Sequence, residues 1–131
     1  MSADFRATVA FPNALLWLMA ENDLELVIPD VDGIGSRWTS GNAWGVAVQH
    51  DADGPVTLTI GTGAPANPAL ALLHEGVLRS SRRLIEVQTV YLDSVITFRT
   101  GTEDAAISIW GDHPDQAECV HIQCQDIEEM L

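Results

Sequence analysis

Apolar and polar side chains alternate along two runs of the chain, residues 84–98 and 105–110, which are joined by a polar turn at residues 100–104. In the second run Ile107 and Ile109 occupy every other position, so both would point to one face of a strand. The first run is rich in valine, isoleucine, threonine and phenylalanine, which suit the pleated surface of a sheet. This pattern predicts a β-hairpin, to which the rest of the chain adds further strands.

Further segments show the pattern of strands. Residues 5–11 alternate and are followed by a proline, which indicates an opening strand at a sheet edge or with one face packed. Residues 44–50 and 55–60 flank an Asp-Ala-Asp-Gly turn, which predicts a second hairpin in which Gly54 takes a positive φ. Residues 118–123 alternate as a last strand.

Three segments are harder to assign. Residues 14–22 carry leucines at helical spacing, but their continuous apolar run fits a buried strand equally well, so helix and strand both remain open. Asn67 is a helix-capping residue type, Pro68 suits a first helical position and Gly76 suits a helix end, which favours a two-turn helix over a strand. Residues 24–28 form a brief strand candidate that ends at a proline.

These elements predict an all-β, mainly antiparallel fold of about seven or eight short strands with one or two short helices. Regular turns without a repeated strand-helix-strand unit are typical of a β-sandwich or a jelly-roll-like barrel. We expect one domain over residues 1–131, with an acidic C-terminal tail at residues 125–131 that tends to fray. A chain of this length buries roughly 65 to 70% of its unfolded surface, so it needs no disulfide or metal to fold.

The charge of the chain is strongly one-sided. Nineteen acidic residues oppose six basic ones, for a net charge of -13, while 47% of the residues are hydrophobic. Such a surface repels nucleic acids and anionic membranes and attracts a basic protein partner, although it also simply keeps a protein in solution. The N-terminus lacks a signal-peptide pattern and no apolar run is long enough to span a membrane, so we expect a cytoplasmic protein.

No catalytic motif stands out in the sequence. All six basic residues are arginines, which excludes Schiff-base chemistry by a lysine, and the chain has no Gly-x-Ser-x-Gly elbow. Cys119, His121 and Cys124 are metal-ligand types, but the two cysteines would face opposite sides of a strand, so we expect no metal site. Residues 61–66 match the G-x-G-x-x-A dinucleotide fingerprint, yet nearby prolines would interrupt its helix, so we expect a plain loop and no cofactor.

Two local features suggest binding. Arg79, Arg82 and Arg83 place half of the positive charge within five residues, where they could bind an anion or pair with the protein's own carboxylates. Trp38 and Trp44 flank a short polar loop, as aromatic residues do at recognition sites, although tryptophans at such positions also serve as core residues. Both alternatives remain open for each feature.

Our first hypothesis is a small acidic, non-enzymatic protein that occupies a basic partner as an inhibitor or an immunity-type protein does. In size and charge the chain resembles small bacterial antitoxins and nuclease inhibitors, although it shares no sequence motif with them. The second hypothesis is a small-molecule-binding or enzymatic barrel with a pocket near His74, Glu75 and the cluster at Arg79 to Arg83. The third is a homo-oligomeric structural subunit that pairs an edge strand at residues 8–11 or 120–123, for example as a homodimer.

Overall fold

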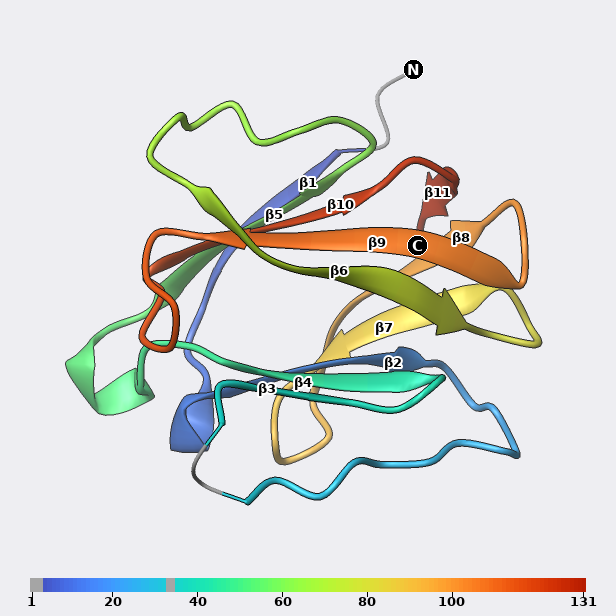
Figure 1. Ribbon diagram of the computed structural model, residues 1–131, viewed down its shortest axis with the longest axis horizontal. Coiled ribbons are helices and arrows are strands. Elements are labelled where there is room, and N and C mark those ends of the chain that lie inside the picture. Colours follow the sequence, from blue (N-terminus) through green and yellow to red (C-terminus); the bar gives the residue numbers. More distant parts are fainter. Residues whose placement is uncertain (1–3, 33–34) are drawn as a thin grey trace.

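Two β-sheets face each other in the computed structural model, which describes residues 4–32 and 35–131 (Figure 1). Sheet A has the spatial order β1 (Phe5–Val9), β5 (Val56–Gly61), β10 (Cys119–Cys124), β9 (Asp104–Gly111) and β6 (Ala71–Arg79). Sheet B has the order β11 (Ile127–Met130), β8 (Ser94–Thr100), β7 (Leu84–Gln88), β2 (Leu15–Ala20), β4 (Ala43–Ala47) and β3 (Arg37–Thr39). The described residues also form two single 3-10 turns, η1 (Pro12–Ala14) and η2 (Asp51–Asp53). The predicted all-β sandwich is confirmed.

Neighbouring strands run antiparallel throughout sheet B and at three of the four pairings in sheet A; the exception is the parallel pair β5 and β10. The described residues contain eleven strands rather than the seven or eight expected, because several strands are too short for their alternation to stand out. No helix among them is long and apolar enough to cross a membrane.

The main core lies between the two sheets and follows the predicted alternation. In β9, Ile107 and Ile109 point inward and are almost fully buried. The largest buried side chains of this core come from both sheets and from the segment after β1: Phe11, Leu16, Leu18, Leu58, Ile60, Leu78, Ile85, Phe98, Ile107, Ile109 and Ile122. Removal of these apolar surfaces from water is the main force that holds the sheets together.

Both predicted hairpins are wrong in their pairing. The strand β8 belongs to sheet B and β9 to sheet A, and likewise β4 belongs to sheet B and β5 to sheet A. The turns between them therefore carry the chain from one sheet to the other. Gly54 takes the predicted positive φ, at 131°, within the crossing from β4 to β5. Alternation reports that a strand is half buried, but it does not report which strand lies beside it.

The open assignment at residues 14–22 is resolved as a strand. All six residues of β2 are buried, because β2 lies between β4 and β7 and is covered on both faces. Leu16 and Leu18 point into the main core, whereas Trp17 and Met19 form a second apolar cluster on the outer face of sheet B. A strand buried on both sides has no polar face, so its sequence does not alternate.

The helix predicted from Asn67 to Gly76 is wrong. The Asn67 side chain does cap a turn by accepting a hydrogen bond from the backbone N–H of Ala69 at 2.9 Å, but the turn ends at once and β6 pairs with β9. A long antiparallel pairing outweighs the local capping preference. The strand candidate at residues 24–28 is also wrong, since this segment is an irregular loop. The expected frayed tail instead contains β11, which pairs with β8.

Candidate functional site

The arginine cluster lies at the crossing from β6 to β7. Arg79 stands 3.9 Å from Glu103 and 3.7 Å from Asp104, and Arg82 stands 3.8 Å from Glu21. The Arg79 pairs are exposed and the Arg82–Glu21 pair is partly exposed, so each contributes little to stability. They do place carboxylates around the cluster, which supports internal charge pairing over anion binding.

The crossing is a tight turn fixed by the buried side chain of Ser80. The Ser80 hydroxyl donates a hydrogen bond to the Leu84 carbonyl at 2.8 Å and accepts one from the Leu84 N–H at 3.1 Å. The next residue, Ser81, donates from its N–H and its hydroxyl to Asp23. Arg83 is exposed and has a φ of 59°, in the left-handed region. The three arginines thus splay outward from a turn that is held by serines.

The two tryptophans do not form one aromatic site. Trp44 is buried in the main core and meets the ring of His74 edge-on, with ring centroids 4.8 Å apart. Trp38 pairs with Gly45 in the register of β3 and β4, so it points to the opposite face of sheet B. There it packs on the second apolar cluster and donates its Nε1–H to Asp32 at 3.0 Å.

The residues of the second hypothesis are also separated. His74 points inward towards Trp44, whereas Glu75 points to the outer face of sheet A. Arg79 follows His74 by five residues on the same strand, which places their backbones roughly 16 Å apart. Burial, and after it the charge of Arg37, lowers the pKa of His74 below its ordinary value. His74 and Glu75 thus point to opposite faces of sheet A, and the structure does not bring His74 together with the arginine cluster.

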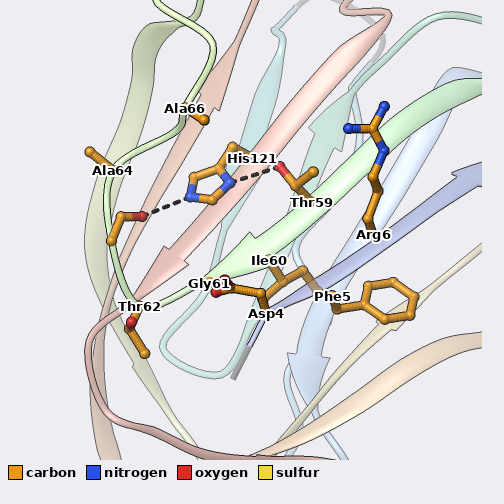
Figure 2. A pocket seen from close by; sticks show the side chains of 11 residues that line it. Asp4, Phe5, Arg6, Thr59, Ile60, Gly61, Thr62, Ala64, Ala66 and His121 are labelled. Carbon is orange, nitrogen blue, oxygen red and sulfur yellow. Dashed lines mark hydrogen bonds between the residues drawn. The ribbon is translucent and has the colours of Figure 1, made fainter. Parts of the chain in front are cut away.

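An open cavity of about 540 Å³ lies instead on the outer face of sheet A (Figure 2). It is lined by Asp4, Arg6, Thr59, His121 and the loop that follows β5. Figure 2 shows the His121 ring between the strand that carries Thr59 and this loop, with a hydrogen bond to each.

His121 fastens the loop to sheet A. Its Nε2 lies 2.8 Å from the carbonyl oxygen of Gly63, which can only accept, so Nε2 carries a proton and donates. Its Nδ1 lies 2.7 Å from the Thr59 hydroxyl. Because both ring nitrogens are engaged and the residue is 7% exposed, the imidazole acts as a structural clamp between the loop and sheet A.

Sequence reasoning considered His121 only as a metal-ligand type, and it missed the clamp because the clamp partners lie about 60 residues away in the chain. The only local sign was a histidine on the outward face of an otherwise alternating strand. The same structure shows that the fingerprint loop at residues 61–66 leads to the turn at Asn67 and then to β6. A helix N-terminus, which holds the pyrophosphate in dinucleotide-binding folds, does not follow the loop.

The two cysteines lie on opposite faces of β10, as predicted. Cys124 is buried in the main core, and Cys119 is half-buried on the outer face of sheet A. Burial raises the pKa of both thiols, and the nearby carboxylates Asp112 and Glu118 raise that of Cys119 further. Neither thiol is activated as a nucleophile.

Of the two segments proposed as edge strands for homo-oligomer formation, one lies at a sheet edge and the other does not. Residues 8 and 9 belong to β1, whereas residues 10 and 11 lie beyond its end; within the described part of the chain β1 is an edge strand of sheet A and pairs only with β5. Residues 120–123 belong to β10, which lies between β5 and β9, so the prediction of an open edge there is wrong. Backbone groups already paired on both sides cannot accept a strand from a second copy.

Comparison with known proteins yields a fold likeness. No protein-family model matches the sequence, and no curated protein matches it either. Among solved structures, the fold is similar to that of ComJ from Bacillus subtilis, the inhibitor of the DNA degrading activity of NucA. The TM-score is 0.69 over 95% of this chain and 97% of ComJ, at 8% sequence identity. The two proteins therefore share an architecture along nearly their whole lengths.

Proposed function

We propose that this protein is a non-enzymatic inhibitor that binds a basic protein, most simply a nuclease, and blocks its nucleic-acid-binding surface. The observation that carries the proposal is the likeness in fold, across nearly the full length of both chains, to an inhibitor of a nuclease. The free cysteines are compatible with a reducing compartment, and we place the inhibitor in the cytoplasm.

The charge of the chain supports this type of partner. A nuclease must neutralise phosphates with lysine and arginine to hold its substrate, so its active surface is basic. A protein with a net charge of -13 is attracted to that surface and competes with DNA for it. Three of the six arginines, Arg79, Arg82 and Arg99, stand beside carboxylates of the same chain, which offsets part of the positive charge.

The test is affinity capture with a functional readout. The purified protein is immobilised and exposed at low salt to an extract of the cells that make it, and bound proteins are eluted with a salt step. We expect the eluate to contain a basic protein that degrades plasmid DNA, and we expect added inhibitor to suppress that degradation. Association should weaken at least about tenfold between low and physiological salt, because exposed charges are screened over about 8 Å at the latter. An eluate without DNA-degrading activity, or binding that salt leaves unchanged, contradicts the proposal.

A further inference from the structure

The outer face of sheet B is covered by two segments, and both expose apolar side chains. Residues 21–32, here named the covering loop, run across this face, and the turn at residues 89–93 projects to the same side (Figure 1, blue to cyan and yellow to orange). Leu26 of the covering loop and Val90 of the turn both pack on the second apolar cluster around Trp17. One side of each segment is thus anchored, and the other side faces solvent.

Hydrogen bonds from Ser40 and Asn42 hold the covering loop in addition to this apolar contact. The Asn42 side chain accepts a hydrogen bond from the Val27 N–H at 2.9 Å and donates one to the Glu25 carbonyl at 2.9 Å. The Ser40 hydroxyl donates to the Val27 carbonyl at 2.5 Å. These contacts hold the backbone of the loop in a defined shape, so its exposed side chains are presented in advance rather than ordered upon binding.

Exposed apolar side chains concentrate on these two segments. Of the nine large apolar side chains that are exposed in the described residues, six belong to them: Leu24, Val27, Ile28, Val31, Tyr91 and Leu92. Tyr91 is 68% exposed and Leu92 is 73% exposed. Scattered apolar residues on a surface need no explanation, whereas a gathering of this kind marks an interaction site, and tyrosine is common at the centre of such sites.

The turn also carries the signs of a functional segment. Leu92 has a φ of 64°, a left-handed conformation that costs free energy in a leucine. At the base of the turn, the buried atoms Gln88 Oε1 and Thr89 Oγ1 have no hydrogen-bond partner within the described part of the chain. Backbone strain and unpaired buried polar atoms both lower the stability of the fold. In proteins they are found most often at functional sites, where the geometry of the surface serves binding.

The negative charge of the covering loop indicates a partner with a basic surface. The loop contains five acidic residues and no basic residue: Glu21, Asp23, Glu25, Asp30 and Asp32. Glu21 and Asp23 contact Arg82 and Ser81 in the crossing from β6 to β7. By contrast, Glu25 and Asp30 are exposed among the apolar side chains of the loop. An apolar surface interspersed with carboxylates fits a protein surface that is basic around an apolar centre. A second copy of this chain, with the same negative charge, is repelled.

We propose that the covering loop and the turn at residues 89–93 form the docking surface for the basic partner. This inference rests on the proposed function and deepens it, because it specifies which face of the sandwich the inhibitor uses. The mechanism is direct: apolar side chains of the two segments are buried against the partner, and the carboxylates of the loop set the orientation and the rate of association.

The test compares matched variants for binding to the nuclease that the salt step elutes. On the docking surface, Val27→Ser and Tyr91→Ala should each weaken the Kd about tenfold. On β6, at the edge of sheet A, the control variants Leu72→Ser and Val77→Ser remove exposed apolar side chains of the same kind and should leave the Kd within about threefold. All four side chains are exposed, and thermal unfolding of each variant confirms that the fold is retained.

Two double variants, each of which removes two carboxylates, test the electrostatic contribution to binding. Glu25→Gln with Asp30→Asn should weaken binding and reduce its salt dependence more than Glu75→Gln with Glu118→Gln, which removes two exposed charges elsewhere. Hydrogen exchange should show protection of residues 21–32 and 89–93 in the complex. If the wild type binds and inhibits the nuclease but the β6 variants lose affinity instead, the docking surface is wrong and the proposed function stands. If the wild type binds no nuclease, the docking surface and the proposed function are both wrong. Self-association through the covering loop, measured on a sizing column, would then show that a second copy of the chain occupies this surface.

Discussion

Trp17→Ala tests whether the outer face of sheet B is a second core. In most two-sheet sandwiches the outer faces are solvated, and a tryptophan there would be only partly covered. Trp17 is 7% exposed, because Leu26, Trp38 and Val90 pack around it. Its ring also lies over Gly45, where an added Cβ would be 3.1 Å from Trp17 Cζ3, so the glycine permits this close approach.

The expected loss of stability follows from this burial. A buried tryptophan removes about 200 Å² from water, which at about 25 cal/mol per Å² corresponds to an upper value of about 5 kcal/mol. Truncation of a buried aromatic residue to alanine lowers the free energy of unfolding by about 3–5 kcal/mol. Because the unfolding entropy of a chain of this size is about 0.28 kcal/mol/K, the Tm should fall by roughly 11–18 °C.

The control is Trp110→Ala on the outer face of sheet A. Trp110 is half-buried and donates its Nε1–H to Gln123 at 3.1 Å, so its loss should cost only about 1–2 kcal/mol. Urea unfolding followed by far-UV circular dichroism measures both variants without relying on tryptophan fluorescence. If Trp17→Ala lowers the free energy of unfolding by no more than Trp110→Ala does, the covering loop does not pack on β2 as described. The docking surface that includes this loop would then lose its support.

Three further predictions concern titratable side chains. Burial, and after it the charge of Arg37, lowers the pKa of His74 below 6.5 in the folded protein. The unfolded chain therefore binds a proton at His74 more readily than the folded chain does. The contribution of His74 to stability is complete above pH 6.5 and decreases as the pH falls below that value. Urea unfolding between about pH 5 and pH 7 should therefore show a smaller acid loss in His74→Gln than in the wild type. His121→Ala removes the clamp on the loop after β5 and should lower the free energy of unfolding by about 1–3 kcal/mol, and an unchanged value would show that the loop holds without it. Cys124 should react with a disulfide reagent only on unfolding and Cys119 slowly at neutral pH; rapid modification of both in the native protein would contradict their burial and raised pKa values.

Residues 105–110 illustrate what the sequence by itself determined. Apolar side chains at every second position define a strand with one buried face, because side chains on an extended backbone point alternately to its two sides. The same local rule identified the strands at residues 5–11, 55–60 and 118–123 and the all-β class as a whole. It also placed the two cysteines of β10 on opposite faces.

The tertiary structure decided the pairing of the strands. Residues 84–98 look like one partner of the hairpin with β9, yet they form β7 and β8 of sheet B. Asn67 caps a turn, yet the following residues pair with β9. The His121 clamp and the covering loop likewise depend on residues far apart in the chain. The physical reason is that alternation, caps and turns act over a few residues, whereas the choice of neighbour is made by the whole core as it excludes water.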